Sequence, residues 1–485
     1  MSNEIYVGAG TQVTLVPESD IYLGSGATES SKVVTHNNSG IKLVNGLYVG
    51  CRLKLEDTSN TIEYHTITAN TDTTLTIEAT TSLTGNLSAT ILQFGAPVPA
   101  AQISSKETLL SDNWLGLVNT FTPFTVDAEM KQLNLAVSGT RNFSHQFKGA
   151  ETVSGGSLDI SLNNGTWLYY ALGTKTFSAT QQLNSGNTAV TLALSQENGK
   201  VYYDDTNKTF HRYTDNLLNP ETSTTDTNMK KMIENGDVEY TFSESNGDDL
   251  PSFALDVSYN KASNTDLVVD STDGTDMYSR VFTGCQVNTF TMSFEESQEL
   301  KCSMDLVSRR AFDSPVAYAP HRKIQGVGGT TTLFNYNAND NIPYMFSDGT
   351  ITLFGQNYAR VKSGTLTINN NITPQRFVGN TSREIMSAHV PGQRTYELSL
   401  SLLITDTKLW SELRQQDEYN DDNGTIKLRF EKDSNDYIEI ELDDYIIQSL
   451  EVPFPDDKGP IEVSATISAR KLTSCKYKGK WIIIG

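Results

Sequence analysis

The residue types that most often carry enzyme chemistry are scattered along this 485-residue chain. The six histidines stand apart, and no His-x-His, His-Glu-x-x-His or Cys-x-x-Cys spacing brings metal ligands together. No Gly-x-Ser-x-Gly segment places a serine nucleophile on a sharp turn. Asn198-Gly199-Lys200 lacks the leading glycine and the hydroxyl residue of a phosphate-binding loop. The sequence therefore predicts a protein with no catalytic residue, metal or cofactor.

Clustered carboxylates are the next candidates for chemistry. Adjacent acids occur at Glu295-Glu296 and at Asp456-Asp457, and a glycoside hydrolase needs two carboxylates across a sugar cleft. Neighbours along a strand point to opposite faces of a sheet, so neither pair can act in that way. The stretch 421–424 mimics a calcium loop, but Tyr419 and Phe430 would occupy positions that need oxygen ligands. A solvated turn is the better interpretation.

The elements that must position these residues are mainly β-strands. Apolar and polar residues alternate at 61–67 and 158–162, the two-residue period of a sheet with one wet face. Two short helices are predicted, one from Asn164 to Leu172 and one from Thr407 to Leu413. Their apolar stripes supply the expected core anchors, which are Trp167, Leu168, Leu409 and Trp410.

Three blocks of the chain recur in the same order. Residues 158–168 match 400–410 at an offset of 242, residues 282–294 match 442–454 at 160, and residues 300–310 match 461–471 at 161. Such a recurrence indicates two tandem copies of one β-domain. The difference 242 − 160 gives the first copy about 82 extra residues, which predicts a surface insert.

These boundaries divide the chain into five segments. An N-terminal segment that joins the first copy is followed by a small β-barrel, the first copy, an inter-domain arm and the second copy. Their ranges are 1–45, 46–95, 96–312 with the insert at 174–259, 313–345 and 346–485. The predicted class is therefore all-β, with two tandem sandwich or barrel domains, a flanking helix on each, and a small N-terminal barrel.

The charge balance bears on possible partners. Lys and Arg number 37 against 58 Asp and Glu, a net charge of −21, which argues against a general nucleic-acid binder. Glu295-Glu296 and Asp456-Asp457 fall on the same turn of the two copies. Repeated around a ring, these four acids would form a negative belt facing a lumen, and such a belt repels a polyanion. The alternative is that the acidity only keeps the protein soluble.

No apolar stretch approaches the roughly 18 residues that a membrane span needs. The start Met1-Ser2-Asn3-Glu4 has neither the basic nor the apolar region of a secretory signal. We therefore expect folding in a cytoplasm and no membrane segment.

Together these patterns resemble the phage tail tube proteins. The resemblance rests on 137–140, on 155–162 with the helix that ends at Gly173, on 361–371, and on 424–471. It implies a non-enzymatic structural subunit that stacks as rings into a hollow conduit for DNA. Two tube domains per chain imply three subunits per ring with pseudo-sixfold symmetry.

The resemblance also implies the partners. These would be further copies of the chain, the tape measure, the tail terminator and the baseplate or tip, with DNA passing through the lumen without specific binding. The protein would be assembled in the host cytoplasm and reside in the virion tail.

Two other classes of protein remain open from the sequence. A multidomain carbohydrate-binding or adhesin-like protein would expose Trp and Tyr in a sugar platform, whereas Trp167 and Trp410 fall on predicted core faces. A polysaccharide hydrolase would need a distant carboxylate pair.

Overall fold

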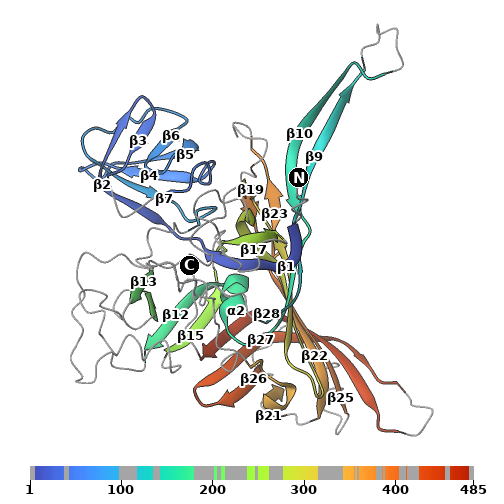
Figure 1. Cartoon of the computed structure of the whole chain (residues 1–485). Helices are drawn as coiled ribbons and strands as arrows, with labels where there is room; N and C mark the ends of the chain where they lie inside the picture. Colours follow the sequence, from blue (N-terminus) through green and yellow to red (C-terminus); the bar gives the residue numbers. More distant parts are fainter. Residues whose placement is uncertain are drawn as a thin grey trace, which may run out of the picture.

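β-strands dominate the computed structural model, which describes most of the chain (Figure 1). The described residues are 6–37, 43–97, 117–134, 142–179, 201–204, 209–212, 238–245, 250–261, 277–314, 342–353, 356–357, 360–377, 385, 388–403, 411, 425–453 and 459–479. The named helical segments among them are α2 (Thr166–Leu172) and the 3-10 turn η4 (Phe346–Asp348). The mainly-β prediction is confirmed.

A small closed barrel forms near the N-terminus. Its strands run in the order β2-β3-β6-β5-β4-β7. They are β2 (Ile21–Ser30), β3 (Val33–Thr35), β4 (Arg52–Glu56), β5 (Ile62–Asn70), β6 (Thr74–Ile77) and β7 (Leu87–Ile91). The barrel therefore takes two strands from residues that the sequence analysis assigns to the preceding segment. Gly24 and Gly26 have positive φ angles at shifts in the β2–β7 register, which obscures the period of β2 in the sequence.

The remaining strands form one large sheet and three separate hairpins. The main path of the sheet is β21-β20-β26-β27-β28-β25-β22-β17-β18-β11-β8. These strands are β8 (Leu117–Thr122), β11 (Gly156–Ser161), β17 (Met277–Glu295), β18 (Lys301–Val307), β20 (Gly349–Leu353), β21 (Gln356–Asn357), β22 (Val361–Asn369), β25 (Thr395–Leu403), β26 (Ile426–Asp433), β27 (Asp436–Glu451) and β28 (Glu462–Lys478). Five further strands branch from this path: β1 (Tyr6–Pro17), β12 (Gly173–Ala179), β15 (Val238–Glu244), β16 (Phe253–Lys261) and β19 (Arg310–Ser314). The hairpins are β9 (Thr125–Leu133) with β10 (His145–Ser154), β13 (Val201–Asp204) with β14 (Thr209–Arg212), and β23 (Thr373–Gln375) with β24 (Ala388–Val390).

The repeat seen in the sequence recurs in the strand pairing. Leu158 of β11 lies opposite Met304 of β18, and Leu400 of β25 lies opposite Ala465 of β28, which are the partners that the offsets 242 and 161 require. The β17–β18 and β27–β28 ladders both shift register just after Val287 and its equivalent Ile447. We call β1, β8 to β11, α2 and β16 to β19 copy 1, and β20 and β22 to β28 copy 2.

β8, the first strand after the barrel, has an equivalent strand in copy 2. Phe121 of β8 lies opposite Leu158 in copy 1, where Gly364 of β22 lies opposite Leu400 in copy 2. β8 is therefore the equivalent of β22 at an offset of 243. The Ser-Gly-Thr pattern shared by 138–140 and 363–365 has a different offset, 225, and therefore does not mark equivalent strands. Residues 138–140 lie outside the described part of the chain.

The core lies on one side of the large sheet, under helix α2. All residues from Trp167 to Leu172 are buried, and Trp167 meets Phe253 in an edge-to-face contact with ring centroids 5.5 Å apart. The Asn164 Oδ1 atom accepts the backbone N–H of Thr166 at 2.9 Å, and Gly173 ends the helix with a φ of 116°. The predicted second helix at 407–413 lies outside the described residues except for Ser411.

The two copies are joined by direct strand pairing. β22 of copy 2 runs antiparallel to β17 of copy 1, with Phe294 opposite Gly364 and Ser293 opposite Thr365. A side chain at Gly364 would meet the ring of Phe294, and Leu400 at 2.7 Å. Glycine thus permits the close approach of the two copies along this seam.

Replacing Gly364 with alanine tests the seam. We expect Gly364→Ala to lower the free energy of unfolding by about 1 to 3 kcal/mol, because the new methyl group overpacks the Phe294 and Leu400 contacts. Ser363→Ala is the matched control, since Ser363 lies on the polar face of the same strand. Denaturant unfolding measures both, and equal stabilities would contradict the seam packing.

Candidate functional site

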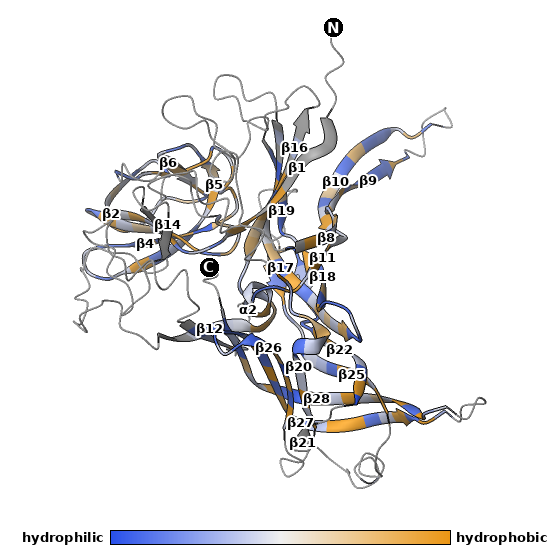
Figure 2. Cartoon of the chain, turned by 60° about the horizontal axis from the view of Figure 1, so that its bottom comes forward, coloured by the Kyte–Doolittle hydropathy of each residue, from blue (hydrophilic) through white to orange (hydrophobic). Residues whose placement is uncertain are grey.

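The sheet face opposite the core carries a continuous polar surface. Along each strand buried apolar residues alternate with more exposed polar ones, as in β18, where Cys302, Met304 and Leu306 are buried. Directly opposed polar residues form rows that cross from copy 1 into copy 2. One row consists of Thr120, Asp159, Ser303, Thr291, Thr367, Glu397 and Ser468. Figure 2 shows the alternation of polar and apolar residues along these strands.

Acidic side chains predominate among the charges on this polar face. The acids in its rows are Asp159, Glu295, Asp305, Glu397, Glu451 and Glu462, and Lys301 is a base among them. Glu462 is neutralised by an ion pair with Lys362. Hydroxyl side chains occupy most of the positions between these charges, so the face is well hydrated and mainly negative.

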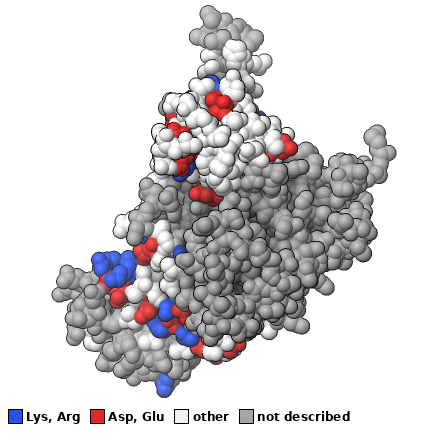
Figure 3. All heavy atoms as spheres, turned by 90° about the vertical axis from the view of Figure 1, so that its left-hand side faces the viewer, with Lys and Arg blue, Asp and Glu red and all other residues white. Residues whose placement is uncertain are grey.

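Part of the surface carries charges of both signs (Figure 3). On the side seen in Figure 3, acidic and basic side chains lie next to one another over the described part of the surface. Glu439 on β27 illustrates this mixing, because its Oε1 atom lies 2.9 Å from Lys427 Nζ and its Oε2 atom accepts a hydrogen bond from Arg429. Burial raises the pKa of Glu439, but these two cations outweigh that effect and leave it below its usual value.

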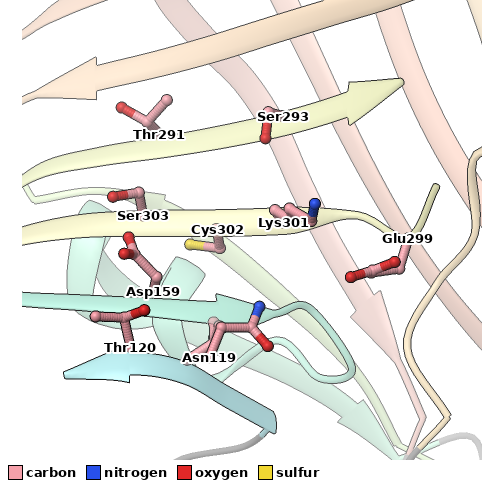
Figure 4. Close-up of a pocket in the computed structure, with 10 residues that line it drawn as sticks. Asn119, Thr120, Asp159, Thr291, Ser293, Glu299, Lys301, Cys302 and Ser303 are labelled. Atoms are coloured by element: carbon pink, nitrogen blue, oxygen red, sulfur yellow. The ribbon is translucent and has the colours of Figure 1, made fainter. Parts of the chain in front are cut away.

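A hollow of about 540 Å³ opens on the polar face where β8, β11, β18 and β17 meet. Figure 4 shows Asp159, Lys301, Ser303 and Thr291 around it, with Asn119 on the β8 side. The Lys301 Nζ atom donates to Gln298 Oε1 at 3.0 Å. Hydroxyl, amide and charged groups line this hollow, but the lining holds no histidine and no nucleophile paired with a base.

Cysteine chemistry and metal binding find no support in the described residues. Cys302 contributes to the hollow, but burial raises the pKa of its thiol well above the usual value, so it stays protonated. No group of three or more His, Cys, Asp or Glu side chains gathers as metal ligands anywhere in the part that the structure describes.

The residues singled out from the sequence fall in different places. Glu295 and Glu296 are exposed at the turn after β17, and the Glu296 N–H donates to the Lys362 carbonyl at 3.0 Å. Trp167 and Leu168 are fully buried in α2. Outside the described residues lie Asp456, Asp457, Leu409 and Trp410.

Among the strand edges that remain open within the described structure are those of β8 and of the later part of β27. β8 is paired with β11 on one side and ends the path of the sheet. β26 covers β27 only as far as Leu442, so the segment 443–451 pairs with β28 alone. Unpaired N–H and C=O groups make such edges templates for another strand. β8 is a short polar strand with little periodicity, so no pattern in the sequence predicts it.

The hairpin β9–β10 projects from the body of the molecule (Figure 1). Its large apolar side chains are exposed, with Met130 at 63% and Phe147 at 51%. A two-stranded ribbon of this kind gains little stability alone in water. The copy 2 equivalent, β23–β24, is much shorter, so the long hairpin is a feature of copy 1 that the sequence did not reveal.

A long sheet with open edges and a polar face is the architecture of a subunit that assembles with others. The sequence model of the family described as phage tail tube protein matches residues 134–469, more than half of the chain. The chain therefore belongs to the phage tail tube protein family and is a structural protein of the virion tail. No curated protein matches the chain. None of the helices in the described part has the length and apolarity that a membrane crossing requires.

The exposure of the hairpin predicts which substitutions the isolated subunit tolerates. Met130→Ser and Phe147→Ser should each change the free energy of unfolding by no more than about 0.5 kcal/mol, as for other exposed positions. Phe290→Ala in the buried core should lower it by about 3 to 5 kcal/mol. Thermal or denaturant unfolding of the unassembled chain checks this, and a large loss in either hairpin variant would mean that the hairpin packs on its own subunit.

Proposed function

We propose that this chain forms closed rings that stack into a tail tube, with β8 of one subunit paired to β27 of the next. The observation that carries this proposal is the seam between the copies. Within the chain, β22 of copy 2 already pairs with β17 of copy 1. β8 and β27 are the equivalents of β22 and β17, and both have an open edge. The same contact between chains would continue the sheet and remove both edges.

The intrachain seam also predicts the register between subunits. Ser293 lies opposite Thr365 at the seam. The copy 2 equivalent of Ser293, at an offset of 160, is Pro453, and the copy 1 equivalent of Thr365, at an offset of 243, is Thr122. We therefore expect Pro453 of one subunit to lie opposite Thr122 of its neighbour. Both positions are exposed in the isolated chain. A ring of six such domains needs three chains, which agrees with the pseudo-sixfold ring that the family resemblance implies.

The polar face would then line the lumen. Closing the sheet into a ring leaves the α2 side outside and the Ser- and Thr-rich face inside. The acids on that face repel the phosphates of DNA, so that DNA passes without binding to the wall. Glu295 belongs to this face, whereas the proposal for Asp456 and Asp457 rests on their sequence equivalence alone.

Stacking of the rings would use the β9–β10 hairpin. Its exposed apolar side chains would be buried if each hairpin packed against a subunit of the neighbouring ring. The tape measure inside the lumen and the terminator and tip proteins at the tube ends complete the expected partners. A non-enzymatic role fits the hollow on the polar face, whose lining offers no nucleophile with a base.

A disulfide across the predicted junction tests the ring. With cysteines at Thr122 and Pro453, oxidation of assembled particles should link neighbouring chains, and covalent trimers should be the largest species on a denaturing gel. The native cysteines are buried and do not compete. A ceiling at hexamers or an open-ended ladder would overturn the threefold ring.

The equivalent pair inside the chain is the matched control. Ser293→Cys with Thr365→Cys should form a disulfide without raising the mass. If this internal bond forms while the Thr122 and Pro453 cysteines never link two chains in assembled particles, the proposed junction is wrong.

Charge reversal tests the lumen. Asp305→Lys with Glu397→Lys replaces two negative charges per chain on the polar face with two positive ones, and assembled tubes should then retain short double-stranded DNA at low salt and release it as salt rises. Asp72→Lys with Glu78→Lys makes the same change in charge on exposed barrel positions. Equal retention by both double variants, measured by co-sedimentation, would mean that the polar face does not line the lumen.

A further inference from the structure

The junction between the barrel and the rest of the chain is built around a buried arginine. Arg309, at the end of β18, is 6% exposed. Its guanidinium donates to the carbonyls of Gly50 and Phe94 and lies over the Phe94 ring at 5.1 Å from the centroid. The next residue, Arg310, donates to the Gly46 carbonyl at 3.0 Å. Two adjacent cations of copy 1 thus hold backbone carbonyls of the barrel.

The counter-charge comes from the strand that leads into the barrel. Glu18 is fully buried, and its carboxylate accepts the N–H groups of Gly284 and Gly95 at 2.8 Å each, together with the Ser252 hydroxyl. Glu18 also forms an isolated bridge with Pro97, where the chain leaves the barrel. The segments that enter and leave the barrel therefore lie side by side at Glu18 and Pro97.

Copy 2 reaches the same junction through β24. His389 is buried, with its Nδ1 atom 2.9 Å from Gln286 Oε1 and its ring edge-on to Phe94 at 5.3 Å. Ile385 of the β23–β24 hairpin lies close to Gly50 of the barrel. The barrel is thus held by groups from both copies at once.

In copy 2 an ion pair occupies the position that corresponds to the barrel junction of copy 1. Asp444 and Gly284 are equivalent, with φ angles of 49° and 62°. In copy 2 Asp444 itself pairs with Arg470 and Lys471, the equivalents of Arg309 and Arg310. A side chain at Gly284 would come within 2.6 Å of the Arg309 Cβ atom, so copy 1 has no room for a carboxylate there, and the Gly284 N–H donates to Glu18.

The apolar part of the junction is small by comparison. Val16, Ala254 and Val281 join the barrel core, and Phe312 packs against it. The barrel has its own closed ring of strands and its own buried residues. A self-contained domain attached through adjacent strands and mainly polar bonds can separate from its support without unfolding.

We propose that the β2–β7 barrel is a latched module, held against both copies by Arg309 with Glu18 as counter-charge and His389 as the link to copy 2, and able to leave as a folded unit. Because His389 and Ile385 belong to the β23–β24 hairpin, a shift of that hairpin opens or closes the latch.

The ionisable groups that face the latch are Glu18, Arg309, Arg310, His389, Cys51 and Cys285. Burial raises the pKa of both thiols, so they stay neutral. Burial, opposed by the Gly284, Ser252 and Gly95 hydrogen bonds and by Arg309, raises the pKa of Glu18 to about 7. Burial and the charge of Arg309 lower the pKa of His389 to about 4.

These two groups act in opposite directions as the pH falls. His389 is protonated more easily in the released state. Docking therefore weakens as the pH falls from 6.5, the ordinary pKa of histidine, to about 4, the pKa of His389 in the docked state. Glu18 is protonated more easily when docked, so docking strengthens as the pH falls from about 7 to its ordinary 4.5. In the natural chain the two effects offset each other.

Hydrogen exchange on the unassembled full chain tests the latch, so the result does not depend on ring formation. Arg309→Met should speed exchange of the Gly95 and Gly284 amides by about 10-fold or more, because a charged hydrogen-bond network is lost. Amides of the barrel ladder, such as those of Leu55 and Ala89, should keep their protection. Arg470→Met, the equivalent change in copy 2, should leave the junction amides unchanged.

Two single variants distinguish the effects of Glu18 and His389. They also test the latch if Arg309→Met does not fold. In Glu18→Gln, junction exchange should accelerate as the pH falls from 6.5 to 4, after correction for the intrinsic rate. In His389→Gln it should slow as the pH falls from 7 to 4.5. Loss of junction and barrel protection together would show unfolding rather than release, and equal behaviour of Arg309→Met and Arg470→Met would also overturn the proposal.

Discussion

Backbone pairing between β17 and β22 is the contact on which the rest of the architecture depends. It makes one sheet out of two copies, and it sets the apolar residues of both against a common core and their hydroxyl and acidic residues on a common face. A one-residue slip along this seam would turn every side chain of copy 2 to the other face. Gly364 permits the close approach at the seam and the Glu296-to-Lys362 backbone bond continues it past the end of β17, so the register is fixed at both points.

The two copies present equivalent surfaces, and they differ where their partners differ. At the end of β18 in copy 1, Arg309 and Arg310 meet barrel carbonyls, whereas Arg470 and Lys471 in copy 2 pair with Asp444. Val281 packs into the barrel core, and its copy 2 equivalent, at an offset of 160, is Glu441, which is partly exposed. Copy 2 therefore lacks the apolar contact surface on which a second barrel could pack. Burial of a charge is tolerated in copy 1 because carbonyls and a carboxylate surround it.

Much of the fold could be predicted from the sequence, because strands with one wet face show a two-residue period and the copies share it. Residues that the offsets make equivalent have equivalent partners in the two ladders. The barrel boundary was missed at β2, where Gly24 and Gly26 break the period, and β8 was missed because it is short and polar. The polar face was recognised only at the Glu295 turn, since the rows through Asp159, Thr291 and Glu397 depend on pairing between distant strands. Glu18 and Arg309 lie 291 positions apart, and nothing local in either segment predicts their meeting.

Fusing two copies in one chain changes the energetics of a closed ring. In the proposed ring of three chains, every second junction between domains would be the hydrogen-bonded β17–β22 seam inside one chain, so only the alternate junctions would cost the entropy of association. The linked partner is present at a high effective concentration, which favours the correct register at the seam before any second chain arrives. The fusion also allows neighbouring positions of the ring to differ. In the proposed ring, a barrel and a long hairpin on copy 1 alone would add threefold features to a wall whose strands repeat six times.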